Sequence, residues 1–356
     1  MKKTNLLKRI LIAIVFLLGM NQVKAQSDMV QLLKSGKADA NLLIRDYAAP
    51  FLETFGNNLN SGWYSTAAPL KTARFTLTIG ATASMVPVDK QNFTINPANY
   101  TNIVTTGNLP ISAPTIFGPK TSPAGLYAIS KNSSGVILKT PIELTGTGVS
   151  MSPLPVAQLS IGLIKGTEVM IRVFPKLAID KYKAGYFGLG LKHDIKQWMP
   201  FMSKMPFELS FIGAFTTASL DITGSNFLSA DATVYNPSPL DYSNQSINFS
   251  STAWNMNLVI SKKLSLLTLF GGIRLSHYST TLALKGNYPI TVKGNTGANE
   301  ILNMVDPIEI DGSGTNFGIN AGLRIKLAIF AIFAEGSYVP GGYSSVTAGL
   351  NIGFFN

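Results

Sequence analysis

The chain offers little material for acid–base or nucleophilic catalysis. Its only two histidines, His193 and His277, each lie near the end of a segment in which apolar and polar residues alternate. His277 follows Ser276 directly, but neighbouring strand residues point to opposite faces, so these two cannot form a serine–histidine dyad. The simpler interpretation is a pair of histidines near lipid headgroups, and the alternative is a lipid hydrolase with a histidine base and another serine.

Other catalytic patterns are missing from the sequence. The 356 residues contain no GxSxG, no HExxH and no phosphate-binding glycine loop. They also contain no cysteine, which excludes disulfides, thiolate metal sites and cysteine nucleophiles. We therefore predict no catalytic residue, no metal site and no cofactor, and we do not expect an enzyme.

A set of charged side chains shares a face with small and polar residues in the alternating segments. These are Arg74, Glu168, Arg172, Lys192, Glu208, Arg274 and Arg324. Charges in an enclosed interior must pair or meet water, so one interpretation is internal salt bridges to the N-terminal residues. The other is that arginines bind the carboxylate of an amphipathic ligand by charge-assisted hydrogen bonds. The predicted ligand-binding residues are Arg172, Arg274 and Arg324.

The alternation that positions these residues has a period of two, which predicts strands. It is clear in RFTLTIGATASM (74–85), FELSFIGAF (207–215) and NFGINAGLRIK (316–326), where one face is apolar and the other small or polar. The expected strands are 74–85, 156–164, 167–174, 182–194, 206–217, 247–261, 266–278, 315–326, 328–338 and 343–355. Such segments, separated by turn residues, are typical of a transmembrane antiparallel β-barrel. We expect 10 to 14 strands, because 86–155 has room for another pair and 280–292 reads as a further strand or an extension.

Composition favours a barrel over the alternative, a secreted β-sandwich. Charged residues make up 13% of the chain, about half of the roughly 25% usual in globular domains. After Met20 the longest apolar run, 327–334, has eight residues, too few for a membrane helix. The polar face carries mainly Gly, Ser, Thr and Asn, whereas the outer face of a sandwich usually carries many Lys and Glu.

The order of the strands predicts their directions in the membrane. If the first strand runs outward, the inner connections are mostly short, and the outer ones, such as 86–155, 218–246 and 279–314, are long. The last strand, 343–355, is expected to pair with the first and so close the barrel. Its aromatic end resembles the signal read by the outer-membrane assembly machinery, although the chain finishes on Asn356.

Residues 1–25 have the features of a cleaved signal peptide. A basic head is followed by the apolar run 10–20 and by Val23-Lys24-Ala25, a small-x-small pattern of the kind found at a signal-peptide cleavage site. Removing the five cations of this leader leaves 24 Lys and Arg against 18 Asp and Glu, so the net charge falls from +11 to +6. That modest balance, without a basic run, does not indicate a nucleic-acid partner.

Residues 26–73 do not alternate. Apolar residues in DANLLIRDYAAPFLETFGNNL recur at helical spacing, with Asp39 placed to cap the helix, Pro50 to kink or divide it and Gly56 to end it. We expect either a plug inside the barrel or a periplasmic appendage, and the low charge favours the plug. The predicted order is a signal peptide (1–25), a helical N-terminal plug (26–73) and a barrel (74–356).

A helical, Asn- and Gly-containing segment that leads into a barrel resembles the outer-membrane long-chain fatty-acid transporter superfamily. QLSIGLIKGTEVMIRVFP (158–175), YFGLGLKHDIKQWMP (186–200) and LFGGIRLSHY (269–278) are most similar to an uncharacterised family of such barrels from gram-negative bacteria. The resemblance implies an N-terminal hatch, an apolar pocket and lateral exit through a break in a strand. Its ligand-binding residues do not match this sequence one by one, and the superfamily includes members that act in protein secretion.

These features predict a protein of the gram-negative outer membrane. The leading hypothesis is a passive channel or transporter for hydrophobic or amphipathic small molecules, and the alternative is a non-conducting scaffold or accessory of surface-protein secretion. The expected partners are outer-membrane lipid, the assembly machinery through the C-terminal strand, and a hydrophobic small-molecule ligand.

Overall fold

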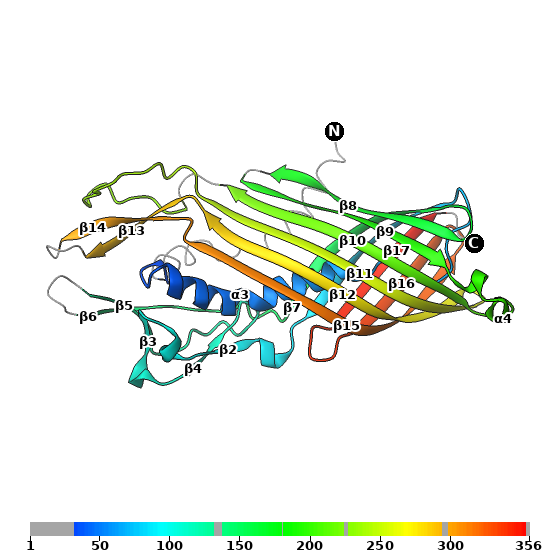
Figure 1. The fold of residues 1–356 in the computed structure, drawn as a ribbon, viewed down its shortest axis with the longest axis horizontal. Coiled ribbons are helices and arrows are strands. Elements are labelled where there is room, and N and C mark those ends of the chain that lie inside the picture. The colour runs from blue at the N-terminus through cyan, green and yellow to red at the C-terminus, as the bar shows by residue number, and fades with distance from the viewer. Residues whose placement is uncertain (1–31, 132–136, 180, 224–226, 294–297, 354–356) are drawn as a thin grey trace.

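Ten antiparallel strands close into a barrel in the computed structural model, which describes residues 32–131, 137–179, 181–223, 227–293 and 298–353 (Figure 1). Around the barrel the strands are β1 (Phe75–Met85), β17 (Ser345–Gly353), β16 (Phe330–Tyr338), β15 (Ile308–Leu327), β12 (Leu267–Lys285), β11 (Ser246–Leu264), β10 (Glu208–Thr223), β9 (Tyr182–Asp194), β8 (Thr167–Ile179) and β7 (Met151–Gly162). The predicted all-β barrel is confirmed, at the lower end of the expected strand number. The predicted leader, Phe354, Phe355 and Asn356 lie outside the described residues.

The first and last strands complete the wall, as expected. β1 pairs with β17 from Thr76↔Gly353 to Ser84↔Ser345, and its other edge pairs with β7 from Phe75↔Ile161 to Met85↔Met151. Backbone groups of both edges are therefore satisfied inside the sheet, which a wall in hydrocarbon requires.

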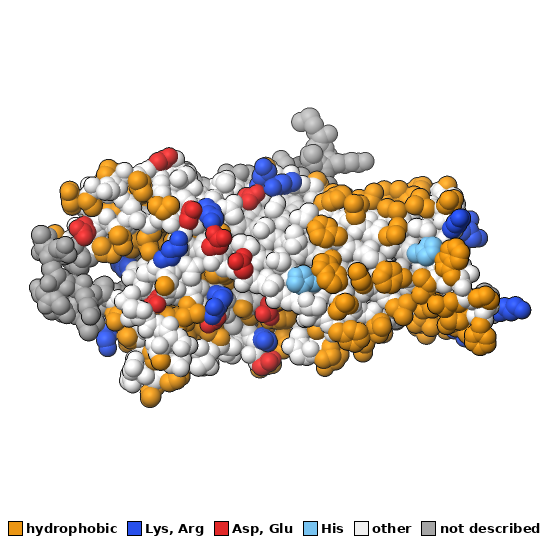
Figure 2. Space-filling view, in the orientation of Figure 1, with side chains coloured by type: hydrophobic (Ala, Val, Ile, Leu, Met, Phe, Trp, Pro, Cys, Tyr) orange, Lys and Arg blue, Asp and Glu red, His pale blue; other side chains and the backbone are white. Residues whose placement is uncertain are grey.

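The outward face changes character along the barrel. On β15 the outward residues near the start of the strand are charged, namely Glu309 and Asp311. Farther along the strand they are apolar, and Phe317 and Ile319 are 57% and 52% exposed. Figure 2 shows apolar side chains covering one half of the barrel and charged groups gathered over the other half. Exposed aromatic residues are present in both border regions of this apolar band: Phe187, Phe215, Phe317 and Tyr338 toward the charged half, and Phe75, Trp198, Phe201 and Phe330 at the opposite end. An apolar band between aromatic girdles is the surface that a bilayer covers.

The two ends of the barrel differ in their connections. At the end beside the apolar band, called the turn end, the strands are joined at Lys165-Gly166, Ser265-Leu266 and Ala328-Ile329 and by the segment 195–207. Lys165 and Gly166 have φ values of 54° and 63°, the positive pair that a tight type I′ hairpin turn requires. The opposite end, called the loop end, carries the long connections, in agreement with the predicted directions.

The loop end contains small sheets of its own. β2 (Asn92–Ile95) pairs with β4 (Ile111–Pro114), while β5 (Leu126–Lys131) pairs with β3 (Ile103–Thr105) and β6 (Ile137–Pro141). β13 (Asn287–Lys293) pairs with β14 (Asn299–Val305). Short helical turns complete these connections: η1 (Val88–Lys90), η2 (Pro97–Asn99) and η3 (Thr106–Asn108). At the turn end, the segment 195–207 contains η4 (Lys196–Trp198) and α4 (Pro200–Ser203). Residues 280–292 thus extend β12 and then form a separate strand outside the wall.

Helix α3 (Lys37–Asn60) begins at the loop end and runs along the inside of the strands (Figure 1). Its first half packs with the small sheets and the strand extensions in one apolar cluster, which includes Leu43, Leu52, Ile103 and Phe249. No helix among the described residues is long and apolar enough to cross a bilayer.

The helix is not divided at Pro50, and the roles expected of Asp39 and Gly56 are wrong. Pro50 lies inside one continuous helix, and the cap residue is Gly36, because Asp39 instead accepts hydrogen bonds from the backbone N–H groups of Thr101 and Asn102 in the loop. Gly56 does not end the helix. A Cβ there would lie 2.3 Å from the ring of Tyr278, so this glycine permits close contact between helix and wall.

An arginine in the apolar band tests its lipid contact. Leu258 points outward from β11 within the band, and Leu258→Arg is expected to lower the free energy of unfolding by about 2–4 kcal/mol in lipid vesicles. Thr252 points outward from the same strand beyond the band, so Thr252→Arg should change it by less than about 1 kcal/mol. Urea unfolding followed by tryptophan fluorescence measures both, and equal effects would contradict a lipid-covered band.

Candidate functional site

The end of α3 is attached to the barrel wall by asparagine side chains. Asn57 donates to Ser84 Oγ on β1 at 2.8 Å, and Asn58 donates to the carbonyl of Ser152 on β7 at 2.7 Å. Asn60 donates to the carbonyl of His277 on β12 at 3.0 Å. The residues 32–73, called the N-terminal segment, are therefore fixed to separate parts of the wall by polar contacts.

Arg172 holds the chain that follows the helix. Its guanidinium donates to the carbonyls of Ser61 and Gly62 at 2.9 and 2.8 Å and to Gln158 Oε1 at 3.1 Å, and it stacks 4.0 Å from the ring centre of Trp63. The side chain is 1% exposed. The planar fork of arginine suits two successive carbonyls and an aromatic face at the same time.

Arg274 approaches the same turn from β12. It donates to Ser61 Oγ at 3.1 Å, to Asn57 Oδ1 at 3.2 Å and to Ser337 Oγ on β16 at 3.1 Å. Arg172 and Arg274 thus both bind Ser61, one through its carbonyl and one through its hydroxyl. The acceptors of these guanidinium hydrogen bonds are neutral groups, so hydrogen bonds to uncharged partners join the wall to the N-terminal segment at Ser61.

Trp63 fills the middle of the barrel because the wall beside it lacks side chains. The indole is 1% exposed and donates to the carbonyl of Leu59 at 3.1 Å. A Cβ at Gly188 or Gly190 on β9 would lie 3.0 or 2.9 Å from its ring. The inward glycines of YFGLGLK therefore form the surface against which the tryptophan packs.

A buried carboxyl group belongs to this interior and was missing from the predicted set of charges. Glu335 on β16 is 3% exposed, and its Oε1 accepts from Asn320 Nδ2 at 3.4 Å. Asn320 also hydrogen-bonds the hydroxyl of Tyr64. The alternation of FAIFAEGSY places Glu335 on the inward face, but the preceding apolar run obscured that signal.

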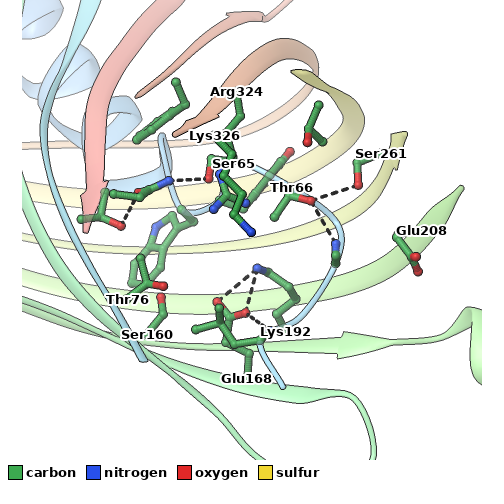
Figure 3. A pocket seen from close by; sticks show the side chains of 18 of the residues that line it. Ser65, Thr66, Thr76, Ser160, Glu168, Lys192, Glu208, Ser261, Arg324 and Lys326 are labelled. Atoms are coloured by element: carbon green, nitrogen blue, oxygen red, sulfur yellow. Dashed lines mark hydrogen bonds and ion pairs between the residues drawn. The ribbon is translucent and has the colours of Figure 1, made fainter. Parts of the chain in front are cut away.

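A cavity of about 370 Å³ lies between the N-terminal segment and the wall at the turn end (Figure 3). Glu168 and Lys192 form an ion pair of 3.1 Å on one side, and Glu168 also accepts from the backbone N–H of Leu70 at 2.9 Å. Arg324 and Lys326 line another side. Apolar lining comes from Trp63, Leu70 and Phe333. The cavity combines charged groups with an apolar wall, as a site for an amphipathic molecule would.

The structure separates the three predicted ligand-binding arginines. Arg172 and Arg274 lie together at Ser61, whereas Arg324 lies in the cavity. Of the other inward charges, Glu168 pairs with Lys192 and Glu208 lines the cavity. The ligand-binding role of the three arginines stays a prediction.

The wall has a weak seam between β7 and β8. Their pairing runs only from Gln158↔Arg172 to Gly162↔Glu168, although each strand continues beyond it toward the loop end. β8 is irregular between Phe174 and Leu177. Within the described residues, 151–157 of β7 pair with β1 but not with β8.

Prolines and one tyrosine characterise the unpaired part of this seam. Pro153 and Pro155 in β7 have no backbone N–H to donate, which suits a strand edge. Tyr186 of β9 donates its hydroxyl to the carbonyl of Pro155 at 2.6 Å. On the inner side lies an apolar cluster that contains Phe55, Leu59, Leu154, Phe174 and Tyr186. The exposed residues bordering the seam include the apolar Met151 and Val173 and, farther along β8, Lys176, which forms an ion pair with Asp221.

Both histidines lie beside tryptophans. His193 accepts from Trp198 Nε1 at 2.9 Å at the turn end, and His277 stacks on Trp254 with ring centres 5.8 Å apart at the other border of the apolar band. These positions fit side chains at the level of lipid headgroups. In the described part of the chain, no group of three His, Cys, Asp or Glu residues is placed to hold a metal ion.

Comparisons with known proteins find one family and several barrels. The model for the "Family of unknown function (DUF6588)" matches residues 1–354, and no curated protein matches. Ail, the attachment invasion locus protein of Yersinia pestis, is 9% identical over 80% of this chain and 99% of its own, with a TM-score of 0.26. The outer membrane protease OmpT from Escherichia coli is 9% identical over 82% and 99%, with a TM-score of 0.30. A FadL homologue of Pseudomonas aeruginosa is 10% identical over 80% and 90%, with a TM-score of 0.21. Activity does not follow from likenesses of this size.

Replacing Arg172 by lysine tests the importance of its fork. Arg172→Lys leaves at least one buried carbonyl of Ser61 or Gly62 without its donor and removes the guanidinium stack on Trp63. We expect the free energy of unfolding to fall by about 1–3 kcal/mol, measured by urea unfolding in vesicles. Arg45→Lys, at an exposed pair with Asp46, is the control and should change it little. A stable Arg172→Lys protein would show that these contacts contribute little.

Proposed function

Because this chain belongs to the DUF6588 family, whose description assigns no activity, we propose its function from the geometry of the barrel. The protein is a plugged outer-membrane barrel that gives amphipathic small molecules a passive route between the lipid and the turn end. In this proposal residues 1–25 are a cleaved leader, 26–73 a plug and 74–356 the barrel. The C-terminal strand is the part that the assembly machinery recognises.

The lipid partner is supported by the outward face. The apolar band, its aromatic borders and the complete β1–β17 closure meet the requirements of a wall in hydrocarbon. The short connections lie at one end of the band and the long ones at the other, so the turn end is the periplasmic end.

The seam is the observation that carries the proposal of transport. Between 151–157 and 173–179 the wall lacks a complete ladder, and apolar residues lie on both sides of it. Among the described residues no ladder of backbone bonds joins 151–157 to β8, and the hydroxyl of Tyr186 bonds the carbonyl of Pro155 there. At the level of Val173, on the bilayer side of the Lys176–Asp221 ion pair, an apolar molecule in the bilayer would therefore reach the apolar cluster beneath the seam.

The N-terminal segment controls the rest of the route. Trp63 and the two buried arginines occupy the middle of the barrel, between the apolar cluster and the cavity at the turn end. The segment adds no strand to the sheet. Its neutral hydrogen bonds contribute about 0.5–1.5 kcal/mol each, and those from the two guanidiniums about 1.5–3 kcal/mol each. Movement of the segment would expose Arg172 and Arg274 to a passing carboxylate, and Arg324 would bind it in the cavity.

A disulfide between plug and wall tests the route. The Oγ atoms of Ser61 and Ser345 are 3.0 Å apart, so Ser61→Cys/Ser345→Cys places two thiols within reach in a chain that has no other cysteine. Gram-negative cells that produce the protein should take up the apolar dye 1-N-phenylnaphthylamine faster than cells without it. Oxidation of the double variant should remove that difference, and reduction should restore it.

A second pair supplies the matched control. Ser251 and Thr280 face each other on β11 and β12 with Oγ atoms 2.9 Å apart, so Ser251→Cys/Thr280→Cys crosslinks wall to wall. Oxidation of this variant should leave dye uptake unchanged. Two results would refute a route controlled by the plug. One is a rate of dye uptake that does not change when the Ser61–Ser345 crosslink forms, and the other is a rate equal to that of cells without the protein.

A non-conducting scaffold of surface-protein secretion is the second candidate. It is favoured by the filled middle of the barrel and by the folded sheets of the loop end, which offer a docking surface. Chemical crosslinking in membranes followed by affinity purification distinguishes the two. A stoichiometric protein partner without dye uptake supports the scaffold, and dye uptake without a partner supports the route.

A further inference from the structure

Positive charge is concentrated at the turn end. Its described residues include ten cations, Lys71, Arg74, Lys165, Lys192, Lys196, Lys204, Lys262, Lys263, Arg324 and Lys326. Against these stand three anions, Glu168, Asp194 and Glu208, so this end has a formal net charge of +7. Figure 2 likewise shows lysines and arginines at this tip of the molecule. An excess of this size attracts anions.

Several of these cations line the cavity, and Lys263 among them is also exposed at the surface. Lys263 on β11 is the register partner of Thr268 on β12, which is in turn the partner of Arg324 on β15. All three line the cavity, and Lys326 lines it two residues farther along β15. Three neighbouring strands thus present Lys263, Arg324 and Lys326 to one space, with the hydroxyl of Thr268 among them.

The negative charge of the acidic residues in the cavity is smaller than the positive charge of its lysines and arginine. The cavity is lined by five cations, including Lys71 and Lys192, and by two carboxylates, which leaves +3. Glu168 binds Lys192 and the N–H of Leu70, and its charge also acts on Arg324. Lys263, Arg324 and Arg74 lie close enough to repel the ammonium of Lys326. Binding an anion among these groups would relieve that repulsion.

We propose that Lys263, Arg324 and Lys326 form a binding site for an oxyanion, the phosphate or carboxylate head of a small amphiphile. The lysines supply point charges, Arg324 and Thr268 supply hydrogen bonds, and Phe333 and Tyr64 provide apolar surface beside them for the first part of a tail. The inference rests on the proposed function for the ligand's access to the cavity, and it adds the charge of the head and the residues that select it.

Calorimetric titration of the purified full chain in a non-ionic detergent tests the site. The probes are inorganic phosphate, dodecyl phosphate and dodecyltrimethylammonium, the last two with the same tail and opposite head charge. Dodecyl phosphate should bind saturably and the cation should not. Lys263→Gln/Lys326→Gln should weaken the binding of dodecyl phosphate about tenfold or more. Lys262→Gln/Lys204→Gln removes the same charge from exposed lysines outside the cavity lining and should change it little.

Each result has a defined meaning. Binding of inorganic phosphate as well shows that the head alone suffices, and binding of dodecyl phosphate only shows that the tail contributes; both support the site. Equal binding of the cationic probe, no binding of either phosphate, or equal losses in the two double variants would overturn it. Because the titration needs no transport, binding without dye uptake refutes only the route, and uptake without anion binding refutes only this site.

Discussion

The need to satisfy every backbone hydrogen bond within the wall determines this structure. In hydrocarbon no water pairs with a strand edge, so β1 and β17 must meet, and the alternation of side chains must hold around the whole circumference. The β7–β8 seam is the exception to this requirement among the described strands. There the ladder stops early, prolines remove donors, and a tyrosine hydroxyl binds one of the carbonyls.

Period-two alternation was sufficient to predict the barrel, its inward face and its closing pair, because strand geometry alone decides which residues face lipid. The small sheets of residues 86–150 were not predicted, since short strands in a polar loop have no such constraint. Gly56 shows a different limit. Its sequence context is typical of a helix end, but its role depends on Tyr278, which lies 222 residues away in the chain.

The candidate site was predictable only in part, for a similar reason. Alternation placed Arg172, Arg274 and Arg324 inside the barrel, but nothing local distinguished the two that bind Ser61 from the one that lines a cavity. The neutral hydrogen-bond partners of Arg172 and Arg274 indicate how the N-terminal segment is held in place. A guanidinium bound to backbone carbonyls specifies the path of a non-sheet segment, because a displaced carbonyl would be left buried without a donor.

The course of α3 has a consequence for the order of assembly. Leu33 and Leu43 pack at the loop end, and the chain then travels the length of the cylinder before β1 starts at the turn end. A wall that had already sealed would have to be threaded lengthwise by a chain carrying bulky groups such as Trp63. Threading is avoided if the hairpins form around the segment and β1 meets β17 afterwards.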